Sequence, residues 1–193
     1  MSAEIEVQTE SELPLDRPIV FVGLMGCGKS SIGKRLAQSF NISFVDADNE
    51  IEKAAQRTIP EIFEEFGEQA FRDGEKRVIE RLLNEDMIRI ISTGGGAFMA
   101  ESTREAIKEK GLCVWLKTDL DTLFERVSRR SHRPLLQTPN PKGTLEKLMH
   151  ERYPVYAEAE LTVETEAVPI EQTVEKVRTA ILNHLKTLRN PDP

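Results

Sequence analysis

Short apolar runs alternate along the chain with longer segments in which apolar residues recur every three or four positions. Runs of this length, bounded by polar or turn-forming residues, predict buried β-strands. The apolar runs are Ile19–Val22, Ile42–Val45, Ile88–Ile91, Leu112–Leu116 and Leu161–Val163.

The segments around these strands have the periodicity of amphipathic helices. Their apolar faces are Ile32, Leu36 and Phe40; Val78, Ile79 and Leu82; Leu120, Leu123, Phe124 and Val127; and Val174, Val177, Ile181, Leu182 and Leu185. Thr58 stands three residues before Glu61, and Thr118 stands three residues before Asp121. This spacing predicts that each threonine caps the start of a helix.

The alternation of strands and helices predicts an α/β fold. Five such strands are typical of a parallel sheet that is covered by helices on both faces. The chain has 193 residues and no internal repeat, which favours one domain. We expect that domain to span residues 17–188, between an acidic N-terminal tail (1–16) and a short C-terminal tail (189–193).

The first strand runs into a glycine-rich segment, Gly23-Leu-Met-Gly-Cys-Gly-Lys-Ser30. This is the P-loop pattern, in which backbone N–H groups and a helix N-terminus point at a phosphate chain. Lys29 would reach the β- and γ-phosphates, and the Ser30 hydroxyl would bind Mg²⁺. A glycine turn with a surface lysine is the alternative, but the place between strand and helix favours the P-loop. The expected nucleotide contacts are Gly26, Cys27, Gly28, Lys29, Ser30 and Ser31.

Two carboxylates follow the second strand. Asp46 and Asp48 are two residues apart, so on an extended chain their side chains would point to the same side. Ligands of open α/β sheets bind at the carboxyl ends of the strands. The pair therefore suits Mg²⁺ with a proton acceptor beside it. The alternative is a polar turn that caps the next helix.

Residues 129–143 carry three prolines, one glycine and four arginine or lysine residues. This composition predicts a long exposed loop, and loops of that length often act as lids over a site.

Composition and charge exclude several function classes. The formal net charge of −7 argues against non-specific nucleic-acid binding. No apolar run approaches the roughly 18 residues of a membrane span, and residues 1–16 lack the apolar core of a signal peptide. Cys27 and Cys113 are expected to be free thiols in a reducing compartment. We therefore expect a cytoplasmic monomer that binds small molecules, and neither nucleic acid nor membrane.

Six motifs occur in an order that resembles the shikimate kinase family over residues 17–188. Any one of them is weak evidence, but six in the same order are specific. They are the P-loop GLMGCGKS, Asp46-Ala-Asp48, Phe71-Arg72 with Glu75, Gly94–Gly96, Arg133-Pro-Leu-Leu136 and Arg152…Tyr156-Ala-Glu158.

The resemblance implies a P-loop kinase fold like that of nucleoside-monophosphate kinases, with three layers and sheet order 2-3-1-4-5. It implies ATP as co-substrate and Mg²⁺ as cofactor. The implied reaction is phosphorylation of the 3-hydroxyl group of shikimate, a step of aromatic amino acid biosynthesis.

The resemblance also implies roles for single residues. Arg72 and Arg152 would hold the substrate carboxylate, Asp48 would contact the reacting hydroxyl group, and Asp46 would reach Mg²⁺. The backbone of the three glycines would approach the substrate where a Cβ atom would intrude. The expected substrate-binding residues are thus Asp48, Arg72, Gly94, Gly95, Gly96 and Arg152.

On the nucleotide side, Arg133 would meet the phosphates from the lid and join Lys29 and Asp48 in catalysis. Arg129 would stack on adenine, with Arg130 as its rival. Residues after the fifth strand would complete the adenine pocket, but no single one can be assigned.

Simpler readings of the same residues remain. Arg72 could form a surface ion pair with Glu75, and Arg152 could belong to a solvated helix face with His150 and Glu151. A kinase of another hydroxy acid, such as gluconate, would share the P-loop. It would be expected to lack the set of arginines and glycines. A non-catalytic nucleotide-binding module would be expected to lose Asp48 or the lid arginine.

Overall fold

The structure is a computed structural model that describes residues 15–129 and 138–189. Arg133 and most of the predicted lid lie outside the described residues, as do residues 1–14 and 190–193 of the predicted tails. Within the two described ranges, no helix combines the length and the apolar character needed to cross a membrane.

The five predicted strands form one sheet, and every neighbouring pair is parallel. Its strand order is β2-β3-β1-β4-β5, which confirms the predicted order. Parallel neighbours need a long crossover, and the predicted helices supply the crossovers. The strands are β1 (Ile19–Val22), β2 (Ser43–Asp46), β3 (Arg89–Ser92), β4 (Leu112–Thr118) and β5 (Leu161–Thr165).

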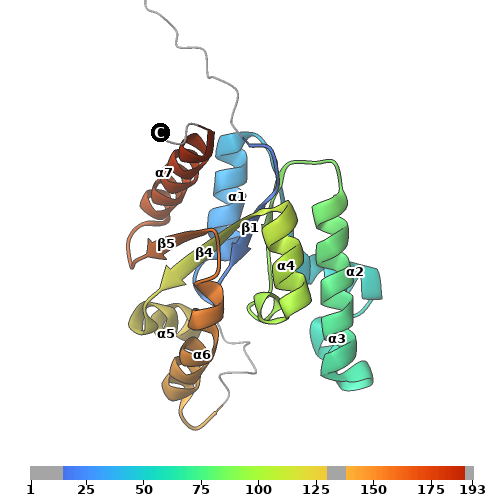
Figure 1. Cartoon of the computed structure of the whole chain (residues 1–193). Coiled ribbons are helices and arrows are strands. Elements are labelled where there is room, and N and C mark those ends of the chain that lie inside the picture. Colours follow the sequence, from blue (N-terminus) through green and yellow to red (C-terminus); the bar gives the residue numbers. More distant parts are fainter. Residues whose placement is uncertain (1–14, 130–137, 190–193) are drawn as a thin grey trace, which may run out of the picture.

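Helices cover both faces of the sheet, as predicted. Figure 1 places α1 and α7 together on one side, and α3 and α4 side by side on the other. The helices are α1 (Lys29–Phe40), α2 (Ala47–Ala55), α3 (Ile59–Asn84), the short 3₁₀ helix η1 (Ala97–Met99), α4 (Glu101–Lys110), α5 (Leu120–Ser128), α6 (Pro141–Tyr156) and α7 (Ile170–Arg189).

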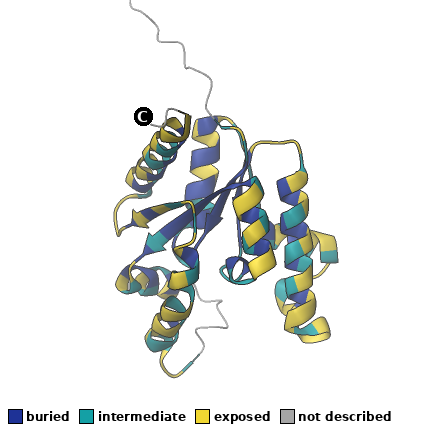
Figure 2. Ribbon diagram, in the orientation of Figure 1, coloured by how far each residue is buried: buried dark blue, intermediate teal, exposed yellow. Residues whose placement is uncertain are grey.

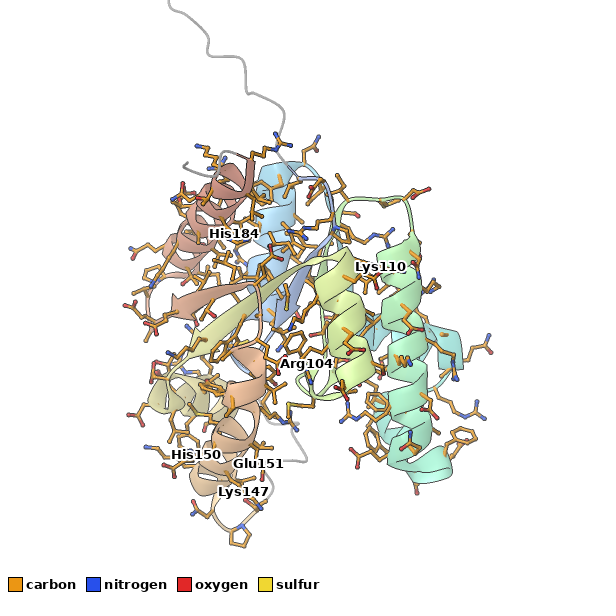
Figure 3. The ribbon with its side chains drawn as sticks, in the orientation of Figure 1. Arg104, Lys110, Lys147, His150, Glu151 and His184 are labelled. Carbon is orange, nitrogen blue, oxygen red and sulfur yellow. The ribbon has the colours of Figure 1, made fainter. Side chains whose placement is uncertain are left out.

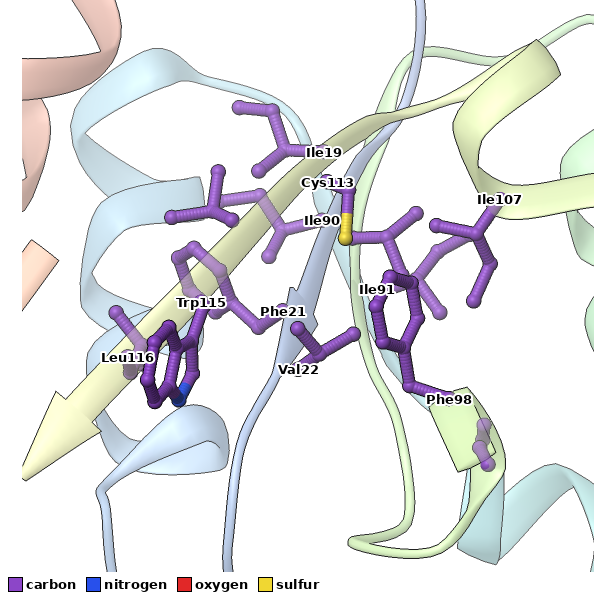
Figure 4. Packing of buried hydrophobic residues seen from close by; sticks show 14 of the residues in the cluster. Ile19, Phe21, Val22, Ile90, Ile91, Phe98, Ile107, Cys113, Trp115 and Leu116 are labelled. Carbon is purple, nitrogen blue, oxygen red and sulfur yellow. The ribbon is translucent and has the colours of Figure 1, made fainter. Parts of the chain in front are cut away.

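The core lies along the three central strands. All four residues of β1 and of β3 are buried, because helices cover both of their faces. Figure 2 shows dark blue strands between helices whose outer faces are yellow. In Figure 4, Phe21 of β1, Ile91 of β3 and Trp115 of β4 belong to this one cluster. The core fixes the strand ends, and with them the loops that follow.

One predicted helix cap is confirmed and the other is wrong. Thr58 caps α3 and shares a reciprocal pair of hydrogen bonds with Glu61. Thr118 caps nothing, because it is the last residue of β4 and its hydroxyl lies 2.5 Å from that of Thr165. Asp119 caps α5 instead, accepting a hydrogen bond from the Thr122 amide at 2.9 Å.

The C-terminal end of the predicted lid is helical. α6 begins at Pro141, so residues 141–143 belong to its first turn and not to a loop. Asn140 caps this helix, since its side chain accepts a hydrogen bond from the Gly143 amide at 3.0 Å. Proline is well tolerated in the first turn, where its missing N–H would have had no helical partner. What looked like a loop signal in the sequence is therefore a helix start.

Candidate active site

A cavity of about 570 Å³ opens where β1, β2 and β3 end. The P-loop, the start of α2 and the glycine turn after β3 meet there, which is the usual ligand-binding edge of an open α/β sheet. Its lining is Met25, Gly26, Gly28, Lys29, Ser30, Ser31, Ile32, Asp46, Asp48, Ser92, Thr93, Gly94, Gly95, Arg126, Arg129, Val168, Ile170 and Thr173.

The P-loop leads from β1 directly into α1, which begins at Lys29. Gly28 precedes the helix with a φ of 103°, a conformation that side chains rarely adopt. Gly26 has a φ of 86°, and a Cβ atom there would come within 2.7 Å of Val127 Cγ1. These glycines allow the tight turn that aims the helix N-terminus into the cavity.

The Lys29 ammonium group lies inside the loop. Its Nζ donates hydrogen bonds to the carbonyl oxygens of Gly23 at 2.7 Å and Leu24 at 3.1 Å. The residue is only 9% exposed. A positive charge is thus already held at the mouth of the loop, where an incoming phosphate could replace the carbonyl oxygens.

Cys27 is predicted as a nucleotide contact, and the structure turns its thiol away from the cavity. The side chain is buried, and the Cys27 amide donates to the Leu24 carbonyl at 3.3 Å. Its sulfur atom lies 3.7 Å from Lys29 Nζ. The thiol therefore packs as a small filler beneath the loop.

The two aspartates both line the cavity, but not as an extended pair. Asp46 ends β2 and caps α2, with its Oδ1 atom accepting from the Asp48 amide at 3.1 Å. Asp48 lies in the first turn of α2. The argument from an extended chain was wrong, because the helix starts immediately after Asp46. The two interpretations of this pair are both confirmed: Asp46 caps α2, and both aspartates line the cavity.

Asp46 faces the P-loop through its second oxygen. Ser30 Oγ donates to Asp46 Oδ2 at 2.7 Å, and Ser92 Oγ lies 3.3 Å from Ser30 Oγ. Hydroxyl and carboxylate oxygens are the hard ligands that Mg²⁺ prefers, and Mg²⁺ commonly keeps several waters while using one or two protein ligands. These residues fit that ion.

The pKa of the Asp48 carboxyl group is raised from 3.8 to about 6, chiefly by burial. The nearby charges of Asp46 and Glu75 contribute to this rise, and the Lys29 ammonium group opposes it. A carboxylate with a pKa near 6 is ionised at neutral pH and is a stronger base than an ordinary aspartate. Asp48 is therefore suited to accept a proton.

Two glycines of the turn Gly94–Gly96, the first and the last, make room for charged side chains. A Cβ atom on Gly94 would lie 2.8 Å from Asp48 Oδ1. A Cβ atom on Gly96 would lie 2.7 Å from both terminal nitrogens of Arg72. None of the three glycines has a positive φ, so the turn needs space rather than an unusual backbone. Side chains of the protein itself therefore occupy part of the space that was expected for the substrate beside these glycines.

The turn also brings Arg72 of α3 and Arg152 of α6 to one place. Arg72 Nη1 forms an ion pair with Glu75 Oε2 at 2.7 Å, and only 3% of the Glu75 side chain is exposed. The ion pair considered as an alternative therefore forms, with a buried acid and an arginine side chain that is 29% exposed. Arg152 Nη1 donates to the Gly95 carbonyl at 2.9 Å.

Other α6 side chains do form a solvated face. Figure 3 shows Lys147, His150 and Glu151 on the outer side of the helix, and all three are exposed. Arg152, the next residue, is partly buried against the glycine turn. The reading as a solvated face thus fits its neighbours and not Arg152 itself.

Arg126 of α5 and Arg129, the residue that ends this helix, also line the cavity. Arg129 was expected there, and Arg126 was not. Arg129 Nη2 contacts Glu125 Oε1 at 2.5 Å, and Arg126 Nη2 donates to the Glu166 carbonyl at 2.6 Å. A spacing of three residues on one helix face was the signal that could have found Arg126. Arg130, the alternative to Arg129 for stacking on adenine, lies outside the described residues.

Val168, between β5 and α7, and Ile170 and Thr173 of α7 complete the cavity. The sequence predicts that residues after β5 contribute here but assigns none of them. Ser92 and Thr93 were also missed, although they directly precede the expected glycines.

Comparison with known proteins identifies relatives of this chain. The family model of shikimate kinase matches residues 25–183. A shikimate kinase of Rhodopseudomonas palustris is 51% identical over 170 residues, which are 88% of this chain and 83% of that relative.

Solved structures agree. A shikimate kinase from Acinetobacter baumannii in complex with shikimate has a TM-score of 0.81 and 38% identity, covering 86% of this chain and 93% of that one. A gluconokinase from Sinorhizobium meliloti has a TM-score of 0.59 and 18% identity, covering 95% of this chain and 100% of that one. The second likeness shows the fold alone. The family model, the relative and the first structure show that this chain belongs to the shikimate kinase family.

Proposed function

We propose that this chain transfers the γ-phosphoryl group of ATP to the 3-hydroxyl group of shikimate. The observation that carries the proposal is that Asp48, Arg72 and Arg152 converge on one glycine turn beside the P-loop. Shikimate is a small triol with a carboxylate that is ionised at pH 7. It needs cations at one end and a proton acceptor at the other, and the turn offers both.

Arg72 and Arg152 bind the shikimate carboxylate. A guanidinium group can donate two parallel hydrogen bonds to a carboxylate, which fixes the orientation of the substrate as well as its charge. Arg72 and Arg152 come from different helices, α3 and α6. The substrate is therefore held between two parts of the fold.

Asp48 accepts or orients the proton of the reacting hydroxyl group. Its pKa of about 6 keeps it ionised at neutral pH. Phosphoryl transfer leaves little covalent work for the protein, so positioning and charge neutralisation dominate.

The nucleotide phosphates occupy the P-loop, against Lys29 and the backbone of Gly26, Gly28 and Ser31. When bound at Ser30 and Asp46, Mg²⁺ would neutralise charge on the phosphates. Of the other predicted contacts, Cys27 would act through its backbone.

The arginines of the lid are proposed from the family resemblance. Arg129 lines the cavity and contacts the adenine end of the nucleotide. Arg133, outside the described residues, meets the phosphates and completes the catalytic set. Closure over the site would exclude water that could otherwise accept the phosphoryl group.

The chain is also proposed to act as a cytoplasmic monomer. Buried free thiols at Cys27 and Cys113 suit a reducing compartment. Light scattering of the purified chain measures the oligomeric state.

The test of the proposed function is ATP consumption by the purified chain with shikimate, quinate or gluconate as acceptor. We expect efficient turnover with shikimate and little with the other two. A preference for gluconate would identify gluconate, and not shikimate, as the substrate. ATP binding without turnover of any acceptor would favour a non-catalytic module.

Removal of either carboxylate-binding arginine is expected to weaken shikimate binding. Arg72→Ala and Arg152→Ala should each cost about 2–5 kcal/mol of binding free energy, because the substrate charge loses its partner in a closed site. Titration calorimetry with shikimate and with ATP separately measures both affinities. Lys147→Ala, on the exposed face of α6, is the control. A variant that lost ATP and kept shikimate would contradict the assignment.

A methyl group on Gly96 is expected to act through Arg72. Gly96→Ala would place its Cβ atom 2.7 Å from the Arg72 nitrogens, so the guanidinium group must move away. We expect shikimate affinity to fall about 10-fold, at the low end of the loss of a charged hydrogen bond. The melting temperature should change little, because the end of a long side chain can shift.

The matched control is Gly74→Ala on α3, where a Cβ atom would meet nothing nearer than Arg77 Nη2 at 4.0 Å. That change should leave affinity intact and stabilise the helix by about 0.5–1 kcal/mol. Unchanged shikimate affinity in Gly96→Ala would show that Arg72 does not bind the substrate from this position.

A further inference from the structure

The hydroxyl group of Tyr156 contacts the glycine turn. Tyr156 is the last residue of α6 and is fully buried, with 0% of its surface exposed. Its hydroxyl donates a hydrogen bond to the Gly95 carbonyl, 61 residues away in the chain. Arg152, one helical turn earlier, donates to the same oxygen at 2.9 Å.

This shared oxygen links the arginine to the turn. A carbonyl oxygen has two lone pairs, and the two donors from α6 can occupy both. Arg152 places Nη1 of its guanidinium group on the Gly95 carbonyl and also interacts with the Tyr156 hydroxyl group. The direction of the Gly95 carbonyl therefore decides where the guanidinium group points.

The same peptide also lies against the P-loop. A Cβ atom on Gly95 would be 3.6 Å from the Gly23 carbonyl oxygen and 3.6 Å from the Met25 amide nitrogen. A shift of this peptide would thus move the part of the site that binds shikimate relative to the P-loop, which binds the phosphates.

Tyr156 is held rigidly. Its ring lies 5.9 Å from that of Trp115 and 6.5 Å from that of Phe98, between centroids, and all three side chains are buried. Burial raises the pKa of Tyr156 to about 12, so the hydroxyl keeps the proton that it donates. A fixed donor on a fixed ring can hold the carbonyl in one direction.

We propose that Tyr156 is a positioning residue for substrate recognition: its hydroxyl fixes the Gly95 carbonyl and thereby aims Arg152 at the substrate carboxylate. The inference rests on the proposed function, since it needs Arg152 to bind an acceptor carboxylate. It adds a buried residue that never touches the substrate to the recognition of that substrate.

The test is Tyr156→Phe, which removes only the hydroxyl group. We expect the KM for shikimate to rise about 10-fold, as for one lost hydrogen bond that orients a charged group. The kcat and the KM for ATP should change less than about 2-fold, because a positioning loss affects carboxylate binding and not the phosphates.

Tyr153→Phe is the matched control. Tyr153 lies on the same helix, packs on Trp115 at 4.9 Å, and donates its hydroxyl proton to the Thr118 carbonyl instead of Gly95. Both variants lose one hydrogen bond and should show similar falls in melting temperature. Only Tyr156→Phe should raise the KM for shikimate. An equal rise in both variants would reveal a general structural effect and overturn the inference.

A double variant separates positioning through Arg152 from an independent role. Tyr156→Phe in an Arg152→Ala background should raise the KM no further, because the arginine to be aimed is gone. A further 10-fold rise there would overturn the inference. The wild-type chain in the same assay tests the proposed function separately. If it fails to phosphorylate shikimate, both the proposed function and the inference about Tyr156 are wrong. If the wild type is active and Tyr156→Phe has normal kinetics, only the inference is wrong.

Discussion

Replacement of Lys29 by alanine is expected to lower kcat about 10³-fold, which corresponds to about 4 kcal/mol of transition-state stabilisation. The ammonium group is nearly buried and held by two loop carbonyls, so its charge is in place before the nucleotide arrives. Charge that needs no rearrangement during the reaction stabilises a transition state most effectively. Steady-state kinetics at saturating ATP and shikimate measures the effect.

The control for this change is Lys34→Ala. Lys34 is an exposed lysine on the same helix, and its Nζ lies 5.8 Å from the centroid of the Phe44 ring. Its loss should leave kcat within about 2-fold, as expected for an exposed position away from the reaction. Circular dichroism should show both variants folded. Near-normal turnover of Lys29→Ala would refute the assignment of the P-loop.

The sequence predicts the features that depend on neighbours within one element. The P-loop and the start of α1 follow from consecutive residues, and the apolar runs follow from burial on both faces of the sheet. The order of the strands in the sheet does not depend on neighbours within one element. It came from the family resemblance, because periodicity does not say which strands pair.

What the sequence missed depends on contacts between distant segments. The Gly95 carbonyl meets Arg152 and Tyr156 from 57 and 61 residues away, and no local pattern records that meeting. Val168, between β5 and α7, lines the cavity formed by distant segments for the same reason. Thr118 was misread because pairing with Thr165 on the neighbouring strand outweighs a local capping pattern.

Asp48 shows, in one residue, both what the sequence predicts and what it misses. The spacing from Asp46 correctly suggested a shared site, but the helix that begins at Ala47 changes how the two side chains reach it. The raised pKa of Asp48 comes chiefly from burial, with Asp46 and Glu75 adding to it. Burial of a charge is a property of the whole fold and is not visible in Asp-Ala-Asp.

Asp48→Asn is expected to lower kcat about 10²–10⁴-fold and to leave shikimate affinity less affected. Asparagine keeps the shape of the side chain but cannot accept the hydroxyl proton. A variant that lost affinity alone would assign Asp48 to binding and not to the chemical step. Kinetics and calorimetry on the same preparation distinguish the two outcomes.

The same substitution should make the free protein more stable at neutral pH. In the folded state the Asp48 pKa is about 6, against 3.8 for an unperturbed aspartate. Between these pH values the folded state binds more protons than the unfolded state, so this group's contribution to stability falls as pH rises through the window. Above pH 6 the full cost of the buried charge is up to about 3 kcal/mol.

Urea unfolding of the ligand-free protein at pH 4.5 and at pH 7.5 measures this cost. The free energy of unfolding of Asp48→Asn should match the wild type more closely at the lower pH and exceed it at the higher pH. Asp73→Asn, which replaces an exposed acid on α3, should show no such widening difference. Equal stability of Asp48→Asn and wild type at both pH values would mean that the Asp48 charge is not destabilised by burial. The high basicity proposed for it would then have no physical source, whereas a widening difference together with lost turnover would show that the fold gives up stability at this position for catalysis.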